Sequence, residues 1–251
     1  MRLRLGAALH EWRRKPIGTR RFAALPGPPP WVPPAEPRSA GSYWPARDGV
    51  FLFGSWTAPA RMRDGSPDWS VDPVHHVRWP RRRTTRRIDL RGAGRAGDVK
   101  YVWEPARFGH AFELSRGGPA ERERLAREVA SWIEQNPWML GVHWDNGLEA
   151  ALRALAWTYS DGVLAAAGEP AWRALRPALV SALHHHGLFI ERQLDRGGYN
   201  HLVADATGLL VLGASYPGLP RARVWADLGE RLLREEVGRQ IRADGSHVES
   251  A

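Results

Sequence analysis

The chain has 251 residues, a formal net charge of +9 and no cysteine. This length can bury a substantial core in one large domain or two small ones. Without cysteine, disulfides and thiolate metal sites are excluded, but the compartment stays open. No long apolar run predicts a membrane span, and charge interrupts the apolar stretch that follows Met1, so no signal peptide is predicted and the cytoplasm is the default location.

The positive charge comes almost wholly from arginine, because Lys15 and Lys100 are the only lysines. A basic surface favours nucleic acid, anionic lipid or anionic polysaccharide as a partner. The densest basic cluster surrounds Trp79 and is expected to be a loop with an aromatic anchor; it contains Arg78, Arg81, Arg82, Arg83, Arg86 and Arg87. No nucleic-acid-binding motif accompanies this cluster, so we expect no nucleic-acid partner and no membrane partner.

Residues 1–97 hold most of the prolines, which exclude long helices over much of this segment. The best candidate strand lies at residues 49–54. We expect an irregular arm whose aromatic side chains anchor it across a folded body; sugar stacking by one of them is the alternative. The tryptophans concerned are Trp31, Trp44, Trp56, Trp69 and Trp79.

Residues 98–251 have helical periodicity and are predicted to form an all-α domain. One apolar stripe runs from Leu125 to Ile133 and ends at Asn136 and Pro137. A second stripe contains Leu148, Ala151, Leu152, Leu155, Ala156 and Tyr159. Short connections predict antiparallel helical hairpins, and the lack of a fixed repeat favours a curved, irregular (α/α) toroid over a repeat array.

The tripeptide Tyr199, Asn200 and His201 lies where two helical patterns meet. Glycines at 197 and 198 end the first pattern, and a new apolar series begins at Leu202. Asn200 is therefore expected to be the N-cap of the next helix, which is the structural alternative to a catalytic role. A carboxamide beside an imidazole on a concave surface is where we expect chemistry.

Two other groups of polar residues have structural and functional interpretations. Adjacent histidines at 184–186 point in different directions on a helix and cannot converge on one ion, so we predict a solvated helix face, no metal and no cofactor. Glu104, Arg107 and His110 are spaced to share a helix face, where they line a cleft or form an internal ion pair. Arg107 is the candidate substrate contact, because its guanidinium matches a carboxylate or sulfate.

Five segments in order, across roughly residues 69–251, resemble the heparinase II/III-type polysaccharide lyases. They are residues 97–104 (GDVKYVWE), followed by Arg107 and His110; 132–137 (WIEQNP); 143–144 (HW) with 149–153 (EAALR); 200–202 (NHL); and 244–250 (DGSHVES). The resemblance implies an (α/α) toroid with a cleft for an acidic polysaccharide, usually followed by a β-sandwich domain. It also implies β-elimination at a uronic acid, with Asn200 and His201 neutralising the carboxylate and His201 a candidate base.

The resemblance also implies two departures. The family's proton-transferring tyrosine follows the last of these segments, beyond Ala251, so we expect an incomplete toroid, an N-terminal fragment that lacks the β-sandwich and is inactive alone. Many relatives have asparagine where this chain has His143, which is either a substrate contact or a buried, hydrogen-bonded histidine. Trp144 is expected to be core at one edge and a sugar platform at the other, and Tyr199 is an additional candidate for substrate binding.

The expected partner is an anionic polysaccharide, which the sequence does not narrow to heparan sulfate, alginate, hyaluronan or a bacterial exopolysaccharide. Two functions remain: a lyase that cleaves uronate-containing polymer, and a carbohydrate-binding or scaffold protein without catalysis. Relatives are often periplasmic or secreted, so the resemblance leaves the location unassigned.

Overall fold

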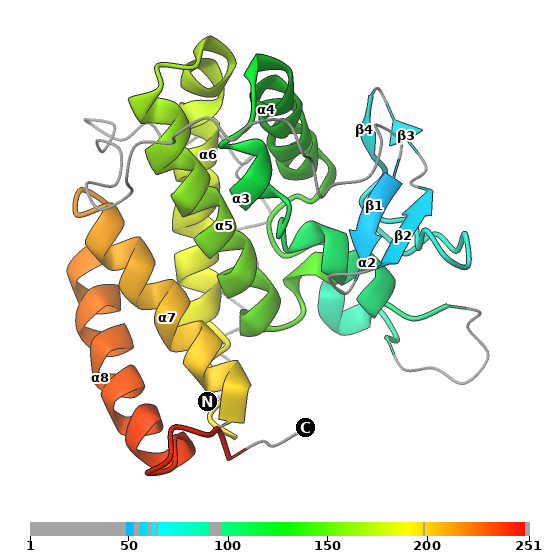
Figure 1. Cartoon of the computed structure of the whole chain (residues 1–251). Helices are drawn as coiled ribbons and strands as arrows, with labels where there is room; N and C mark the ends of the chain where they lie inside the picture. Colours follow the sequence, from blue (N-terminus) through cyan, green and yellow to red (C-terminus); the bar gives the residue numbers. More distant parts are fainter. Residues whose placement is uncertain are drawn as a thin grey trace.

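The computed structural model describes residues 49–52, 56–59, 62–63, 65–90, 97–197 and 199–248 (Figure 1). Trp31 and Trp44, and the side chain of Trp56, lie outside the described part. The arm expected over residues 1–97 is therefore described only from Gly49 onward, with gaps. Within it, β1 (Gly49–Leu52) pairs antiparallel with β2 (Trp56–Pro59), and β3 (Met62–Arg63) pairs with β4 (Ser66–Pro67). The strand predicted at 49–54 is present and ends two residues earlier.

From Lys100 onward the described chain is mostly helical. Its α-helices are α2 (Lys100–Ala106), α3 (Ala111–Leu114), α4 (Pro119–Gln135), α5 (Gly147–Ala166), α6 (Pro170–Arg192), α7 (Tyr199–Ser215) and α8 (Ala222–Gln240). A 3-10 turn, η1 (Thr85–Arg87), precedes α2, and another, η2 (Val142–Trp144), lies between α4 and α5. None of the described helices is both long and apolar enough to span a membrane.

Successive long helices run in opposite directions and form a curved double layer (Figure 1). α5 packs against α6 and α7, α7 packs against α8, and α4 packs against α6. One layer thus contains α5 and α7, and the other contains α4, α6 and α8. The all-α fold of antiparallel hairpins, consistent with an (α/α) toroid, is as predicted from the sequence.

The predicted stripe on α4 is correct, since Leu125, Val129 and Trp132 are buried. Trp69 and Trp79 are also buried, as expected for tryptophans that anchor an irregular segment. Trp69 stacks on Phe108 in the main core, and Trp79 packs with Ile88 in a smaller cluster. These contacts fix the end of the N-terminal segment against the helices.

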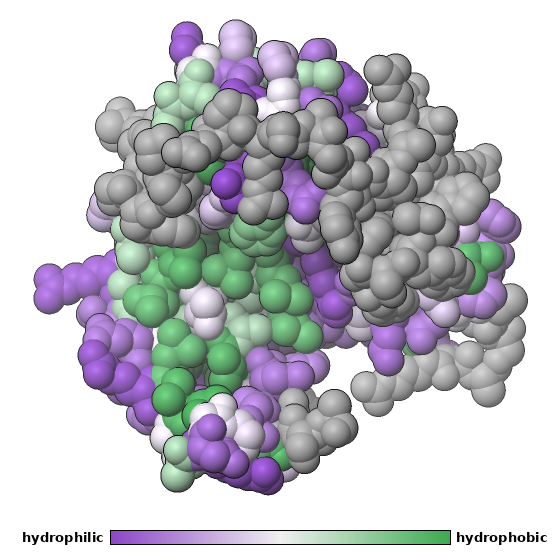
Figure 2. Space-filling model, in the orientation of Figure 1, coloured by the Kyte–Doolittle hydropathy of each residue, from purple (hydrophilic) through white to green (hydrophobic). Residues whose placement is uncertain are grey.

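The most buried side of α5 is not the predicted leucine stripe. Ala151 and Ala156 are buried, but the larger members of the stripe, Leu148, Leu152, Leu155 and Tyr159, are only half-buried. Hydrophobic side chains gather over α5 and α7 on the face seen in Figure 2. The side of α5 that turns into the core combines alanines and Trp157 with buried polar residues such as Arg153 and Asp161.

Asp161 is one of these core residues, and it joins three helices. Its carboxylate accepts hydrogen bonds from Trp172 Nε1 at 3.0 Å, from Arg176 Nε at 2.8 Å and from the Tyr216 hydroxyl at 3.1 Å. A buried carboxylate is tolerated here because several donors satisfy it.

The expectation of a solvated face at residues 184–186 is wrong. His184 and His186 are buried, and His185 is half-buried. As expected for adjacent helical residues, the three rings have different neighbours: His184 lies beside Trp225, His185 beside Trp138 and His186 beside Trp144. Each of the three imidazoles thus packs against a tryptophan ring.

Candidate functional site

The amino end of α7 presents Asn200 and His201 at the surface. The helix begins at Tyr199, so Asn200 lies in the first turn and is exposed. The expectation that Asn200 is the N-cap is therefore wrong, because the helix starts one residue before it. No described residue forms a hydrogen bond with the Asn200 carboxamide, which leaves both its donor and acceptor atoms open to a ligand.

His201 is held by an acidic neighbour from the preceding connection. Its Nδ1 lies 3.3 Å from Asp195 Oδ2, and its side chain is 43% exposed. With Nδ1 directed to Asp195, the second ring nitrogen is left for another partner. Tyr199, also exposed, has a left-handed backbone with φ of 64°, which is uncommon for a residue with a side chain.

Asp205 lies one helical turn beyond His201 and is fully buried. Its Oδ2 accepts a hydrogen bond from the Asp195 backbone N–H at 3.0 Å, whereas its Oδ1 has no partner among the described residues. Burial raises the pKa of Asp205 to about 7, with the nearby Asp195 charge acting in the same direction. Asp205 thus fixes the segment that holds His201 and titrates near neutrality.

Gly147, the first residue of α5, makes room for this carboxyl group. A Cβ atom at Gly147 would lie 2.3 Å from Asp205 Oδ1, so any side chain there would collide with it. The amino ends of α5 and α7 therefore meet, at the same end of the helical layer (Figure 1). Because each helix amino end bears a partial positive charge, the region where α5 and α7 begin has two such charges close together.

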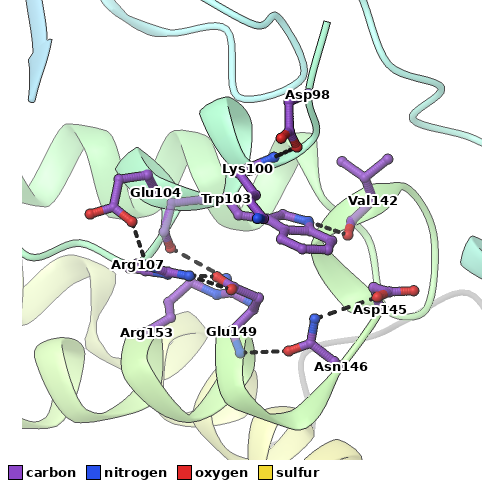
Figure 3. A network of polar contacts seen from close by, with 11 residues as sticks. Asp98, Lys100, Trp103, Glu104, Arg107, Val142, Asp145, Asn146, Glu149 and Arg153 are labelled. Atoms are coloured by element: carbon purple, nitrogen blue, oxygen red, sulfur yellow. Dashed lines mark hydrogen bonds and ion pairs between the residues drawn. The ribbon is translucent and has the colours of Figure 1, made fainter. Parts of the chain in front are cut away.

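Arg107 lies in an ion-pair network beside the start of α5 (Figure 3). Its Nε and NH2 atoms donate to the two carboxylate oxygens of Glu149 at 2.9 and 2.7 Å, and NH1 contacts Glu104. Although burial works against the cation, these carboxylates raise the pKa of Arg107 above its ordinary value. Of the two roles considered for Arg107, the structure has the internal ion pair, and His110 instead contacts Glu128 at 2.7 Å.

His143 is buried rather than open to a polymer. Its Nε2 lies 2.6 Å from the Trp69 carbonyl oxygen, and its Nδ1 has no partner among the described residues. Burial lowers the pKa of His143 to about 3, and the neighbouring Arg153 cation contributes. Of the two interpretations of His143, the structure thus has the buried, hydrogen-bonded one.

Trp144 is also mostly buried, and its Nε1 donates to the Asn136 carbonyl at 3.2 Å. One edge lines a cavity of about 220 Å³ between the end of α4, η2 and α6. The other lining residues are Trp132, Ile133, Asn136, Pro137, Trp138, Ala178, Ser181, Ala182 and His185. Asn200 and His201 do not line this cavity, so the candidate residues divide between two places.

Arg153 ties these buried elements together. Its Nε donates to His186 Nε2 at 2.8 Å, and its NH2 donates to the His143 carbonyl at 3.2 Å. The guanidinium also lies over the Trp132 ring, 4.0 Å from its centroid, in a cation–π contact. Burial lowers the pKa of Arg153 to about 9.

The structure brings Asn200, His201 and Tyr199 together at one exposed helix end and gives them Asp195 and Asp205 as neighbours. Neither acid is among the site residues predicted from the sequence. Asp205 had a usable signal, because it is the one charged residue in an otherwise uncharged stretch from Leu202 to Leu212, four residues after His201. Asp195 had no such signal, since loop acids are common.

Comparison with known proteins decides the family. The sequence profile described as Heparinase II/III N-terminus matches residues 101–251. The chain belongs to the heparinase II/III family. All five segments that carry the resemblance, apart from the first four residues of the first, lie within this match.

Two solved structures were compared with this heparinase II/III chain, and the first of them shares its fold. A heparinase III with methylated lysines has 21% sequence identity and a TM-score of 0.50 over 64% of this chain and 28% of its own. The heparan sulfate lyase HepC from Pedobacter heparinus has 21% identity and a TM-score of 0.48, over 64% of this chain and 26% of its own. The heparinase II/III chain thus spans less than a third of the length of these proteins. No functionally curated protein matches it.

Proposed function

We propose that the amino end of α7 binds the carboxylate of a uronic acid residue in an anionic polysaccharide, as part of a lyase that cleaves by β-elimination. Family membership supports the class of reaction, and the solved structure that shares the fold is a heparinase III. The observation that carries the proposal is the exposed pair Asn200 and His201, side by side at a helix amino end.

The chemistry requires that a negative charge be neutralised. Removal of the proton at C5 of a uronate places a developing carbanion next to an existing carboxylate. The C4–O bond then breaks, a C4–C5 double bond forms, and the leaving oxygen takes a proton. Hydrogen bonds from the Asn200 amide and the His201 ring to the carboxylate lower this barrier, because they act on charge that builds up in the transition state.

The surroundings of His201 suit this role. Asp195 fixes the ring through Nδ1, at 3.3 Å, so that Nε2 is the atom directed to substrate. The helix amino end adds backbone N–H groups and a partial positive charge, both of which favour a bound carboxylate. The two roles need different states of the ring: with Nδ1–H directed to Asp195, only the protonated ring can also donate from Nε2 to the carboxylate, whereas the neutral ring, with Nε2 unprotonated, is our candidate base.

A binding experiment tests the location of the site. We expect size-defined heparan sulfate or alginate oligosaccharides to shift the NMR signals of Asn200 and His201 more than those of other residues. Asn200→Ala and His201→Ala should each weaken binding by roughly 10- to 100-fold, because each removes a hydrogen bond to a charged group. Arg223→Ala, an exposed change on α8, is the matched control. Unchanged affinity in both site variants would refute the proposed site.

A second assay tests the reaction. Unsaturated uronate products absorb in the ultraviolet, so an increase in absorbance that His201→Ala abolishes would establish β-elimination. Oligosaccharide binding at Asn200 and His201 without new absorbance would instead favour the second candidate, a carbohydrate-binding protein without catalysis. This second function is supported by four exposed arginines without acidic partners among the described residues: Arg82, Arg83, Arg86 and Arg87.

A further inference from the structure

The basic cluster at residues 78–87 separates into two groups. Arg78 forms an ion pair with Asp68, with NH2 2.7 Å from Oδ2, and Arg81 donates to Gln135 Oε1 at 3.2 Å. These two arginines belong to the fold. The four others, Arg82, Arg83, Arg86 and Arg87, are exposed, and none of them has an acidic partner among the described residues.

The turn that carries these four arginines is firmly attached. Trp79 and Ile88, on either side of it, are buried in the same small core. Thr84 pairs with Leu140 in an antiparallel bridge, and the Gly141 N–H donates to the Arg83 carbonyl at 2.9 Å. The Thr85 hydroxyl also contacts the Gly141 carbonyl. The guanidinium groups therefore project from a fixed backbone, which lowers the entropy lost when a ligand binds.

Exposed arginines on the helices are arranged differently. On α4 and α8 many of them pair with an acid one turn away, as Arg127 does with Glu123, Arg223 with Asp227 and Arg234 with Glu230. Those charges are largely neutralised by their neighbours. The turn at 82–87 has four cations within six residues and no such compensation, so it attracts anions more strongly than the helix surfaces do.

We propose that Arg82, Arg83, Arg86 and Arg87 form an anion-binding face for the sulfate and carboxylate groups of an anionic polysaccharide. The choice of polymer rests on the proposed function. Gly141, which holds the turn, leads through η2 to the amino end of α5, where α7 also begins. A long polymer can therefore contact the arginine face in addition to the site at Asn200 and His201.

The geometry favours polysaccharide over nucleic acid. Guanidinium groups match sulfate, carboxylate and phosphate oxygens alike in a two-point contact, so the choice of polymer depends on the shape of the turn and its tryptophan. The turn contains a 3-10 helix of three residues, which is too short to read a DNA groove, and its tryptophan, Trp79, is buried and cannot stack on a base.

The test measures affinity for a heparin oligosaccharide at several salt concentrations. The variant replaces Arg82, Arg83, Arg86 and Arg87 with alanine. The control removes the same charge elsewhere, through alanine at Arg127, Arg223, Arg231 and Arg234, all of which are exposed. We expect the first variant to lose roughly 100-fold in affinity, with a weaker salt dependence, and the control to lose less than about threefold.

Three outcomes would overturn the proposal. Equal losses in both variants would mean that overall charge alone attracts the polymer, and unchanged affinity in the first variant would mean that the face is not used. Tighter binding of duplex DNA or RNA than of heparin at the same salt would assign the face to nucleic acid. His201→Ala separates this test from that of the proposed function: if the reaction and the site at Asn200 fail, heparin affinity still reports on the arginine face.

Discussion

The segment from η2 into α5 and the amino end of α7 both carry motifs of the heparinase II/III family, but their environments are opposite. In the first, His143, Trp144 and Arg153 are buried. In the second, Asn200 is exposed, His201 is half-exposed, and Asp205 beneath them has an oxygen without a described partner.

This contrast teaches that a family motif does not by itself identify a site. The residues at 143–153 build the fold, because their polar atoms are used by one another and by His186 and Trp69. The residues at 199–201 leave polar atoms available. The first region is therefore expected to control stability, and the second to control binding.

Arg153→Ala should have the largest effect on stability. It removes a buried side chain and leaves acceptors unsatisfied on His186, His143 and Ala106. We expect the free energy of unfolding to fall by about 3–5 kcal/mol, as for other broken buried polar networks. Urea denaturation followed by circular dichroism measures this. Arg153→Lys is the control for charge, and a loss of less than about 1 kcal/mol in Arg153→Ala would contradict the role given to the network.

Asp205→Asn should raise the free energy of unfolding above neutral pH, whereas Arg153→Ala lowers it. The carboxyl pKa is 3.8 in the reference state and about 7 in the fold. Between these two pKa values the folded protein holds a proton that the unfolded chain has released. The free energy of unfolding therefore falls as the pH rises toward 7, and it stays at the lower value above pH 7. Removing the charge should stabilise the protein by roughly 2–4 kcal/mol at pH 8.

The comparison of Asp205→Asn with the wild type at two pH values provides the check. The gain measured by urea denaturation at pH 8 should largely disappear near pH 3, where the carboxyl is protonated in the fold and mostly protonated in the unfolded chain. Equal differences at both pH values would show that titration of Asp205 is not the cause. Asp227→Asn serves as the control, because the Asp227 side chain on α8 is 73% exposed.

Histidine protonation gives a third, smaller effect. Burial lowers the pKa of His143 to about 3, and burial and Arg153 also lower the pKa of His186. Stability from a depressed histidine pKa is complete above about pH 6.5 and is lost as the pH falls, since the unfolded chain takes up the proton first. We expect the free energy of unfolding to fall by about 2 kcal/mol from pH 7 to pH 5 because of His143 alone.

His143→Gln tests this assignment, because a glutamine amide can still donate to the Trp69 carbonyl but does not titrate. Its unfolding free energy should depend less on pH between 7 and 5 than that of the wild type. An identical pH dependence would place the titration on other groups.

Periodicity was sufficient to predict the helices, the hairpins and the strand at residue 49, because these depend on local patterns. It failed where burial depends on distant partners. The inward side of α5 carries Arg153 and Asp161, whose partners His186 and Arg176 lie on α6. A polar residue is predicted to be solvent-exposed unless its buried partner is known. The prediction of a solvated face for the histidines at 184–186 fails for the same reason.

The candidate site was predicted in part. The amide beside the imidazole could be found from the sequence, because Asn200 and His201 are adjacent. The contacts of Arg107 with Glu149 and of Asp205 with Gly147 bring together residues more than forty positions apart. No spacing rule within one sequence predicts them.

His201→Ala and Asn200→Ala should have the smallest effects on stability, within about 0.5 kcal/mol, because both side chains are at least partly exposed and His201 makes only a surface ion pair. Both variants should weaken oligosaccharide binding and leave the free energy of unfolding unchanged. Arg153→Ala should lower the free energy of unfolding and, at temperatures where it remains folded, leave oligosaccharide binding unchanged. Urea denaturation and oligosaccharide titration of the same samples make the distinction. If His201→Ala unfolded as readily as Arg153→Ala, the amino end of α7 would be part of the structural core, and its polar atoms would not be reserved for a ligand.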